Sequence, residues 1–396
     1  MNIEELRAEI DRIDSDIIRL YGERLETTSQ IGRYKKEHNL PVTDPARERE
    51  VLNKVGAEAG EKNENGVRAL FGFLMAQSRT NQMLERKETS ELGQLIRRSL
   101  KETPELFPER ATVACQGVEG AYSQQACEKI FRSPSIMYCR TFENVFSAIE
   151  SGLCRYGILP IENSLAGSVN SVYDQLISRK CYIVRSARVK IDHTLLVKPG
   201  TKAEDIREVW SHEQAIHQCS NFLTENKQWK VNISTNTAAA AQMVAESGRN
   251  DVAAISSAHC APLYGLEILK TDIQNNGNNH TRFICISRQP EIYPGADRTS
   301  LMLALPNRPG ALYQLLGRFY AQGINLTKLE SRPVPGKDFE FMFCFDIDAS
   351  VYSPAFARLI EELDVTLEKC AYLGSYSELA RNANSMQNAE LSGEIS

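Results

Sequence analysis

Apolar side chains recur every seven positions through the first thirty-five residues of the chain, which is the pattern of a helix that buries a narrow seam. The two seam positions carry branched aliphatic residues, namely Ile3, Ile10, Ile17 and Ile31 at one and Leu6, Ile13 and Leu20 at the other. Arg24 and Thr27 interrupt the seam, and Arg7 and Lys35 flank it. A buried guanidinium is costly unless it meets an anion. The pattern therefore predicts a long helix whose inward cations bind a small acid.

Two further helices are predicted before residue 85. The first helix should end near His38, because Pro41 blocks its continuation, and Asp44 should cap a second helix with Pro45 at its first position. A third helix should begin near Glu64 and carry an apolar stripe that continues into polar positions, namely Val67, Leu70, Phe71 and Leu74, then Ser78 and Gln82. We assign residues 1–85 to this helical domain, and residues 86–110 to a charged linker around a short helix at 92–100.

Residues 111–290 alternate short β-branched runs with helical ones, which predicts an α/β domain whose sheet is covered on both faces. The expected strands are 112–116, 157–161, 231–235, 251–256 and 282–287, and the expected helices are 143–151, 213–225 and 237–246. A ligand of such a domain should lie where strands end and helices begin.

Residues 298–376 follow the order strand, helix, strand, strand, helix, strand, which is typical of a ferredoxin-like βαββαβ domain. Strands are expected near 300–305 and 339–348, and helices near 310–322 and 354–363. The polar tail at 377–396 should be loose.

The length and composition indicate a soluble chain of several domains. The 396 residues, 42% apolar and 24% charged, are too many for one ordinary core. A net charge of -5 without a basic stripe offers no surface for nucleic acid, and no apolar run suits a membrane span or a secretory signal. We expect a cytoplasmic protein that binds neither nucleic acid nor membrane.

Neither a metal nor an organic cofactor is expected. The ten cysteines are scattered, mostly in apolar stretches, and no C-x-x-C pair occurs, which favours buried reduced thiols. His212 and His217 stand five positions apart, whereas a helical zinc pair needs a spacing of about four.

The cations of the first helix can converge if two copies of the chain associate. An α-helix rises about 1.5 Å per residue, so Arg24 and Lys35 stand about 16 Å apart and their long side chains can reach one ligand. Arg7 lies about 25 Å from Arg24 along the same axis. If two such helices pack antiparallel, Arg7 of one chain arrives beside Arg24 and Lys35 of the other, which gives two equal sites per dimer. We therefore predict a homodimer or a higher homo-oligomer.

Polar residues of the next two helices complete this pocket, namely Asp44, Arg47, Glu48, Ser78 and Gln82. The pocket offers no serine or cysteine paired with a histidine, and no metal cluster. It suits a reaction that needs clamping and charge stabilisation. An all-helical dimerisation module with surface ion pairs explains the same residues about equally well.

The helical segment carries a specific set of residues: Leu6, Arg7, Glu23, Arg24, Gly32, Lys35, Pro41, Val42, Asp44, Arg47, Glu48, Ser78 and Gln82. This set resembles the bacterial AroQ-type chorismate mutases. The resemblance implies that chorismate rearranges to prephenate, with its two carboxylates bound by Arg24 and the partner's Arg7, supported by Arg47. It implies that Lys35 and Gln82 donate to the ether oxygen, that Asp44, Glu48 and Ser78 orient the hydroxyl end, and that Ile31 forms a wall.

Four short motifs follow in the α/β segment: Gly117, Gly120, Tyr122 and Ser123; Pro160 to Ser164; Ser211, His212, Gln214 and Gln218; and Thr281, Arg282 and Phe283. Glycines after a strand let backbone amides approach an anion, and neutral Asn, Ser and Gln side chains can orient a polar substrate. In this order the motifs resemble prephenate dehydratase, which implies a two-lobed fold like that of periplasmic binding proteins. Glu213 departs from the family, which usually has proline there, and should reshape a helix start.

The resemblance implies roles for these residues in the loss of carbon dioxide and hydroxide from prephenate. Thr281 would protonate the leaving hydroxyl or relay the proton. Substrate placement would fall to Glu162, Asn163, Ser164, Ser211 and Gln218. Arg282 would pair with a carboxylate, although a structural ion pair is an equal alternative. Ser164 can also be a helix cap before Leu165.

The last domain has two motifs at strand ends: Asn307, Arg308, Pro309, Gly310, Ala311 and Leu312, and then Glu330, Ser331, Arg332 and Pro333. They resemble the ACT domains of phenylalanine-sensitive dehydratases, which implies an effector site formed by Asn307, Gly310, Ala311, Leu312, Glu330 and Ser331. Tyr313 replaces the usual small aliphatic residue, which leaves open the affinity for the amino acid and its identity.

Together the segments predict a bifunctional enzyme of phenylalanine synthesis, chorismate mutase joined to prephenate dehydratase and inhibited by phenylalanine. Three alternatives stand beside it. A solute-binding protein would carry an export signal, and a fusion to prephenate dehydrogenase would need a nicotinamide-binding fold, whereas the chain has no G-x-G. The third is a dehydratase with an inert helical arm.

Overall fold

The computed structural model describes residues 2–86, 90–333, 341–367 and 369–379. The chain divides into two compact units, Met1–Arg98 with Leu301–Ala371, and Ser99–Ser300 with Tyr372–Ser396. Each unit is therefore built from segments that lie far apart in the sequence. Within the described ranges, no helix has the length and apolar character needed to cross a membrane.

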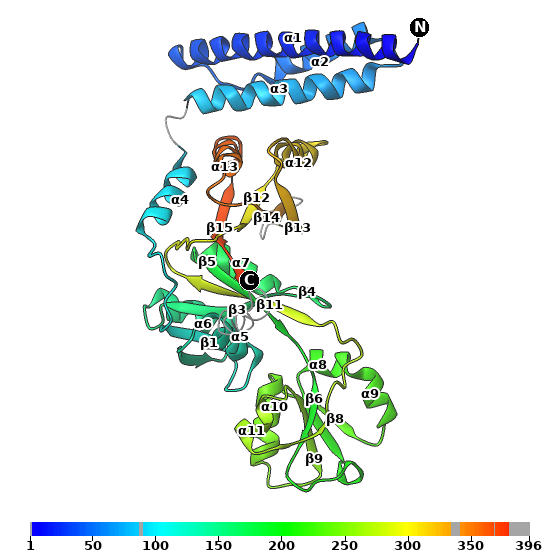
Figure 1. The fold of residues 1–396 in the computed structure, drawn as a ribbon, viewed down its shortest axis with the longest axis vertical. Coiled ribbons are helices and arrows are strands. Elements are labelled where there is room, and N and C mark those ends of the chain that lie inside the picture. Colours follow the sequence, from blue (N-terminus) through cyan, green and yellow to red (C-terminus); the bar gives the residue numbers. More distant parts are fainter. Residues whose placement is uncertain (1, 87–89, 334–340, 368, 380–396) are drawn as a thin grey trace, which may run out of the picture. The chain divides into compact units, whose positions relative to one another are not determined.

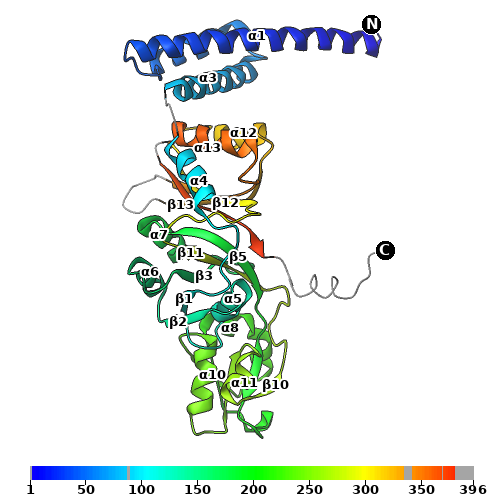
Figure 2. The same cartoon turned by 60° about the vertical axis from the view of Figure 1, so that its left-hand side comes forward.

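Three helices form the N-terminal part of the first unit, α1 (Ile3–Glu37), α2 (Pro45–Ala59) and α3 (Glu64–Arg86). Asn2 caps α1 by accepting a hydrogen bond from the Glu5 amide at 2.8 Å, and Asp44 caps α2 by accepting one from the Arg47 amide at 3.0 Å. Helices α1 and α3 run side by side (Figures 1 and 2). The predicted cap at Asp44, the helix end at His38 and the start at Glu64 are confirmed.

Helix α1 packs closely against α3 at Gly32, which is buried. A Cβ atom at this position would lie 2.9 Å from Gln82 Cγ and 3.3 Å from Gln82 Cα. Much of the heptad seam stays exposed in the single chain, with Ile3, Ile10 and Ile17 at 62%, 56% and 57% exposure. One copy of the three helices therefore leaves an apolar surface uncovered.

Four strands and two helices form the C-terminal part of the first unit and continue past its boundaries. They are β12 (Arg298–Ala304), α12 (Ala311–Ala321), β13 (Asn325–Pro333), β14 (Phe341–Asp348), α13 (Pro354–Thr366) and β15 (Cys370–Tyr376). The strand order is β13-β14-β12-β15. Phe319 of α12 stacks on Phe345 of β14 with ring centroids 5.4 Å apart, and both are fully buried. The predicted βαββαβ order is confirmed, as is the short helix before the dehydratase-like segment, α4 (Glu91–Glu102).

The first lobe of the second unit is a mixed sheet in the order β16-β5-β11-β3-β1-β2, with β4 paired to β3. Its strands are β1 (Thr112–Gln116), β2 (Ser135–Cys139), β3 (Tyr156–Asn163), β4 (Gly167–Ser168), β5 (Tyr182–Lys190), β11 (His280–Ser287) and β16 (Glu378–Leu379). Strand β11 is antiparallel to both β3 and β5, whereas β1 pairs in parallel with β2 and β3. Its helices are α5 (Tyr122–Ile130), α6 (Phe142–Glu150) and α7 (Asn170–Arg179).

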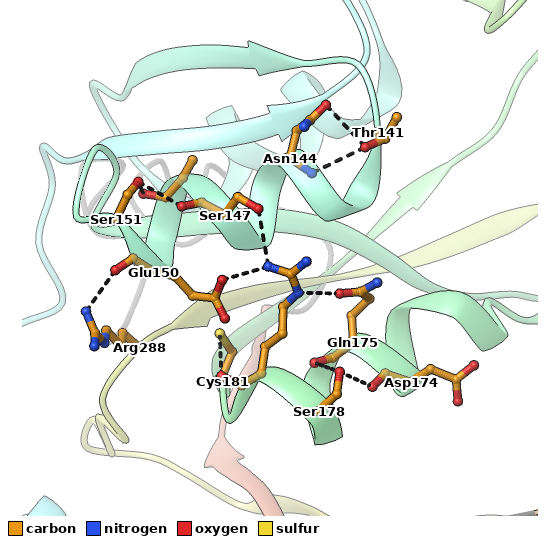
Figure 3. A network of polar contacts seen from close by, with 12 residues as sticks. Thr141, Asn144, Ser147, Glu150, Ser151, Asp174, Gln175, Ser178, Cys181 and Arg288 are labelled. Carbon is orange, nitrogen blue, oxygen red and sulfur yellow. Dashed lines mark hydrogen bonds and ion pairs between the residues drawn. The ribbon is translucent and has the colours of Figure 1, made fainter. Parts of the chain in front are cut away.

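Helices α6 and α7 are joined by a polar network (Figure 3). The guanidinium of Arg179, at the end of α7, donates to Glu150 Oε2 at 2.6 Å and to Ser147 Oγ at 3.2 Å, both on α6. Arg288, which follows β11, donates to the Glu150 carbonyl at 2.8 Å. These bonds fix α6 and α7 relative to each other.

The second lobe is a five-stranded sheet in the order β10-β6-β9-β7-β8. Its elements are β6 (Thr194–Val197), β7 (Glu208–Ser211), α8 (Glu213–Gln218), α9 (Ser220–Glu225), β8 (Lys230–Ile233), α10 (Thr237–Glu246), β9 (Val252–Ser256), α11 (Cys260–Tyr264) and β10 (Glu267–Lys270), with a 3-10 turn at Ala203–Asp205. The chain crosses between the lobes twice, from β5 to β6 and from β10 to β11. The two crossing segments bond to each other, since the Ile191 amide donates to the Asn279 carbonyl at 2.8 Å.

Three expectations from the pattern are wrong. The α/β segment holds two sheets rather than one, as the two-lobed resemblance implied. The helix expected at 213–225 breaks at Cys219, because the Gln218 carbonyl accepts the Asn275 amide at 2.7 Å instead of continuing the helix. Glu378 and Leu379, expected in a loose tail, pair in parallel with Ser186 and Ala187 of β5, and the rest of that tail lies outside the described residues.

All ten cysteines are free thiols, and nine of them are buried. The burial expected from their positions in apolar stretches is therefore confirmed for nine of them.

Candidate active sites

A cavity of about 500 Å³ lies between the two lobes of the second unit. Its lining combines residues from both lobes, among them Gln116, Tyr122, Ser123, Asn163, Ser168, His193, His212, Gln214, Gln218, Thr235, Asn236, Thr237 and Thr281. The cavity lies where β1, β3 and β7 end, which is the kind of place where the sequence pattern predicts a ligand.

No aspartate, glutamate, lysine or arginine is among the residues that line this cavity in the described chain. Four helices of at least nine residues start at its wall instead, marked by lining residues Tyr122 of α5, Phe142 of α6, Val169 before α7 and Thr237 of α10. Helix N-termini present amides without intrahelical partners and a partial positive charge. The cavity can therefore hold an anion through backbone dipoles and neutral side chains.

Asn163, at the end of β3, pairs with Thr281, near the start of β11, in the register of these two antiparallel strands. Asn163 Nδ2 donates to Thr281 Oγ1 at 3.0 Å, and Asn163 Oδ1 accepts the amides of Leu165 and Ala166 at 3.0 and 2.9 Å. Thr281 is 8% exposed and Asn163 7%. The structure thus holds the Thr281 hydroxyl in a fixed position at the cavity.

Gln218 approaches this pair from the other lobe through Asn279. Asn279 Nδ2 donates to Gln218 Oε1 at 3.1 Å, and Asn163 Nδ2 donates to Asn279 Oδ1 at 2.8 Å. His193 Nε2 bonds to the same Gln218 oxygen at 2.8 Å. Burial lowers the pKa of His193 below its ordinary value, against the opposing effects of Gln218 and Asp192.

Glu162 and Arg282 pair with each other, with Nη2 and Oε2 at 3.1 Å. Neighbouring side chains of a strand point to opposite faces, so this pair lies on the other face from Asn163 and Thr281. Arg282 is buried and Glu162 is 38% exposed in its side chain, and neither lines the cavity. Of the two readings of Arg282, the geometry matches the structural ion pair.

Ser164 and Ser211 also lie outside the cavity lining. The Ser164 hydroxyl donates to the Asn278 carbonyl at 3.2 Å and accepts the His280 amide at 3.0 Å, so it joins the turn after β3 to the start of β11 rather than capping a helix. Ser211 is fully buried and donates to the Ile255 carbonyl at 2.6 Å. Both hydroxyls support the walls of the site in this structure.

The glycines after β1 do not offer amides to an anion, contrary to expectation. The Gly117 amide donates to the Cys139 carbonyl at 2.8 Å, and the Gly120 amide donates to Gln124 Oε1 at 2.7 Å. Gly120 has a φ of +84°, and a Cβ there would lie 2.8 Å from Cys260 Sγ of the other lobe. Gly120 is required for close approach of the lobes, and the start of α5, where Tyr122 and Ser123 line the cavity, can supply amides instead.

Sequence reasoning missed His193, Asn279 and Asn236. His193 and Asn279 lie on the two crossing segments, outside every strand or helix pattern. Asn236 Oδ1 caps α10 through the Ala239 amide at 2.8 Å, and the sequence Asn-Thr before a helix is the signal that could have found it. Tyr122, a motif residue, is tied down by its hydroxyl, which donates to the Asp192 carbonyl at 2.6 Å, and burial raises its pKa.

In the helical domain the structure brings Arg24 and Ser78 together. Arg24 Nη1 donates to the Leu74 carbonyl at 2.9 Å and to Ser78 Oγ at 2.6 Å. Burial lowers the pKa of Arg24. Both partners are neutral, so the positive charge is left for an anionic ligand.

Lys35 and Gln82 lie further along the same two helices. Lys35 Nζ donates to the Val42 carbonyl at 2.7 Å, which ties α1 to the turn before α2. Gln82 is buried, and its Oε1 has no hydrogen-bond partner among the described residues. Buried polar atoms without a partner are uncommon, so this unpaired acceptor marks Gln82 as a residue to test in a ligand site.

The remaining predicted residues of the helical domain are not gathered at one point: Asp44, Arg47 and Arg7 are exposed, and Glu48 is half-buried. Asp44 caps α2, Arg47 pairs with Glu50 at 2.7 Å and both of these side chains are exposed, and Glu48 accepts a hydrogen bond from Arg79. Arg7 is exposed on α1, far along the helix from Arg24. One chain therefore does not bring Arg7 to the other cations.

In the last domain, Gly310 caps α12 with a φ of +80°, and the residues Asn307, Ala311 and Leu312 flank this helix start. Glu330 and Ser331 lie on β13, where Glu330 pairs with Lys328 at 3.2 Å. Tyr313 is 75% exposed.

Among the described residues, no group of three or more His, Cys, Asp or Glu could hold a metal ion.

Comparison with known proteins finds three family models in order along the chain. Chorismate mutase type II matches residues 6–83, prephenate dehydratase 113–291 and the ACT domain 299–364. The bifunctional chorismate mutase/prephenate dehydratase of Escherichia coli K12 is 31% identical and covers 94% of this chain and 95% of its own. An Arabidopsis thaliana chloroplastic arogenate dehydratase/prephenate dehydratase is 38% identical over 67% of this chain and 73% of its own.

A crystal structure of prephenate dehydratase from Arthrobacter aurescens, in complex with L-Phe, is 27% identical with a TM-score of 0.62. It matches 71% of this chain and 97% of its own. The two-lobed fold with a C-terminal ferredoxin-like domain is therefore shared with a solved structure.

Proposed function

We propose that two separate sites carry the two reactions of this chain, which belongs to the family of bifunctional chorismate mutases/prephenate dehydratases. The helical domain rearranges chorismate to prephenate, and the interlobe cavity converts prephenate to phenylpyruvate, carbon dioxide and water. This proposal rests mainly on one observation: among the described residues, no charged side chain lines the interlobe cavity, and four helices start at its wall.

In the cavity, the two carboxylates of prephenate are held by helix N-termini and neutral donors, and Gln218 and Asn163 orient the ring. The bond from the ring to its carboxyl carbon breaks and releases carbon dioxide, and its electron pair moves into the ring as the carbon–oxygen bond of the hydroxyl breaks. The Thr281 hydroxyl donates the proton that turns the leaving hydroxide into water, and solvent restores it. Asn163 supports this role because it donates to one lone pair of Thr281 Oγ1 and leaves the hydroxyl proton for the substrate.

Glu162, Ser164, Ser211 and Arg282 act in this proposal by holding the strands and turns that carry the cavity residues. Their hydrogen bonds to main chain or to each other support that role.

In the helical domain, Arg24 and the partner's Arg7 bind the two carboxylates of chorismate, with Arg47 adding positive charge. Lys35 and Gln82 donate to the ether oxygen as its bond to carbon breaks, Ser78 fixes Arg24, Asp44 and Glu48 orient the hydroxyl end, and Ile31 forms a wall. The rearrangement needs no transferred proton, so positioned charges suffice.

Two copies of the chain form the mutase site. The exposed heptad seam of α1 supports this association, because a continuous stripe of exposed large apolar residues, four of them at more than half exposure, is unusual for a monomer. Antiparallel pairing carries Arg7 along the helix by about 25 Å to the other chain's Arg24.

Mixing two inactive variants tests the shared site. In Arg7→Ala and Lys35→Ala chains, unfolded and refolded together, mixed dimers place both substitutions in one site and leave the other intact. Mutase activity should return to about one quarter of wild type at random pairing. No recovery with dimers formed would show that each chain builds its site alone.

Phenylalanine binds the last domain and inhibits the dehydratase. The start of α12 at Gly310 offers amides to the carboxylate, and Glu330 and Ser331 lie on the strand that follows α12. Gly310→Val should weaken inhibition by phenylalanine and leave uninhibited activity in place, because φ is positive at this position. Unchanged inhibition would place the effector elsewhere.

The division of labour is tested with one variant per site. Lys35→Ala should abolish consumption of chorismate and leave conversion of supplied prephenate intact, and Thr281→Val should do the reverse. If Lys35→Ala consumes chorismate at the wild-type rate, the helical domain is an inert arm. If Thr281→Val retains dehydratase activity, the proton comes from another group.

A further inference from the structure

Gln218 and Thr281 belong to one hydrogen-bonded chain that begins at a buried histidine. The order is His193, Gln218, Asn279, Asn163, Thr281, with donor–acceptor distances of 2.8, 3.1, 2.8 and 3.0 Å. All five side chains border the cavity or bridge two residues that do. His193 is 2% exposed and Asn279 is fully buried.

The direction of each bond in this chain follows from Asn163. Its Oδ1 accepts the main-chain amides of Leu165 and Ala166, which can only donate, so the amide cannot be turned around. Asn163 Nδ2 therefore donates to Asn279 Oδ1 and to Thr281 Oγ1. The other end of Asn279, Nδ2, then donates to Gln218 Oε1.

Because Gln218 Oε1 is an acceptor, the proton of the neutral His193 ring must lie on Nε2. Its Nδ1 is buried and has no partner among the described residues. A charged ring would need an acceptor at Nδ1, so the neutral tautomer is favoured here.

These bond directions determine which polar atoms Gln218 and Thr281 offer to a ligand. Two donors occupy Gln218 Oε1, so the Nε2 group is the end of this cavity-lining amide that is left to bond a ligand, and it is a donor. Without His193, Gln218 Oε1 keeps only the Asn279 donor, so the Gln218 amide is held less firmly in this orientation. At the other end, Thr281 keeps its hydroxyl proton free.

Main-chain bonds hold the two residues at the crossings between the lobes. The His193 amide donates to Gln274 Oε1 at 2.9 Å, and the Ile273 amide donates to the His193 carbonyl at 3.1 Å. The Ile191 amide donates to the Asn279 carbonyl on the other crossing. His193 and Asn279 are thus placed by the backbone that joins the lobes.

We propose that His193 and Asn279 are positioning residues of the dehydratase site, which set Gln218 as a donor toward the anionic substrate and hold Asn163 and Thr281 in register with it. The proposal rests on the proposed function, since it assigns these residues to the reaction at the same cavity.

Three single variants test the proposal on the full-length chain with supplied prephenate. His193→Leu removes the Nε2 donor and should lower dehydratase kcat/KM by about 10- to 100-fold. His193→Gln places a side-chain N–H donor near the position of His193 Nε2, so its dehydratase kcat/KM should stay within about threefold of wild type. Asn279→Asp removes the donor to Gln218 without a change of size and should lower kcat/KM at least as much as His193→Leu.

Matched controls separate positioning from folding. His259→Leu makes the same exchange at an exposed histidine of the second lobe, and should leave kcat/KM unchanged. Thermal unfolding reports whether the lobes remain folded in each variant.

The decisive readout is a double-mutant cycle with Gln218→Met. If His193 acts through Gln218, His193→Leu should lower kcat/KM no further in the Gln218→Met chain. Losses that multiply, a wild-type kcat/KM for His193→Leu, or equal losses for His193→Leu and His193→Gln would each overturn the proposal. If Gln218→Met and Thr281→Val themselves keep full activity, the proposed function of the cavity fails instead, and the two failures are distinguishable.

Discussion

Replacing Gly32 with alanine tests how tightly Gln82 must be held for the mutase reaction. The added Cβ would lie 2.9 Å from Gln82 Cγ and 3.3 Å from its Cα. Carbon atoms in ordinary contact are about 3.5–4.0 Å apart, so Gln82 or helix α1 must move by about 0.6 Å or more. The backbone atom in contact means that a side-chain rotation alone does not relieve the crowding.

The cost to stability should be small and the cost to activity large. Alanine in place of glycine favours a helix by about 1 kcal/mol, while overpacking costs about 1–3 kcal/mol, so the net loss should be at most about 2 kcal/mol. A displacement of 1 Å at a reacting group can cost about 100-fold in rate, so we expect mutase kcat to fall about 10-fold or more.

The assay follows chorismate consumption and prephenate consumption separately on one preparation. Gly22→Ala on the same helix is the matched control, because a Cβ there meets nothing within 4 Å. It should leave both activities unchanged and raise the melting temperature slightly. Full mutase activity in the Gly32→Ala chain would show that Gln82 is not held by this contact, and a loss of dehydratase activity would show a general folding defect.

Three further outcomes follow from named contacts. Arg24→Lys keeps the charge but cannot bond Leu74 and Ser78 as the planar guanidinium does, so mutase kcat/KM should fall about 10- to 100-fold, and an unchanged value would remove Arg24 from the site. Gly120→Ala adds a Cβ 2.8 Å from Cys260 Sγ at a φ of +84°, so dehydratase activity and melting temperature should both drop while mutase activity persists, and Cys260→Ala in addition should restore part of the loss. Burial lowers the pKa of His193 from 6.5, so the folded chain binds fewer protons than the unfolded one, and the stability contributed by neutral His193 should be full above pH 6.5 and lost as the pH falls through the lowered pKa. The unfolding free energy of His193→Gln should therefore fall less steeply than that of wild type below pH 6.5 in denaturant titrations, and parallel curves would contradict the assignment.

Local signals in the sequence were sufficient for the helical and ferredoxin-like domains. Asp44 and Pro45 mark a helix start because a cap acts within three residues, and the heptad of α1 follows from one repeating position. The heptad pattern also indicated which cations lie in or beside the seam. In the single chain, however, Arg7 is exposed and lies apart from Arg24 and Lys35.

The cavity could be predicted only through resemblance, because its residues meet through pairings of long range. Asn163 and Thr281 are 118 residues apart and are joined by the register of β3 and β11, which no local pattern specifies. His193 and Asn279 lie on segments that cross between lobes and have no periodicity. The break at Cys219 and the pairing of Glu378 with β5 likewise depend on partners distant in the sequence.

The most direct test of two linked reactions on one chain is the time course of the purified protein with chorismate as sole substrate. We expect chorismate to disappear, prephenate to appear transiently, and phenylpyruvate to accumulate in an amount equal to the chorismate consumed. Accumulation of prephenate without phenylpyruvate, or chorismate left unchanged, would contradict it.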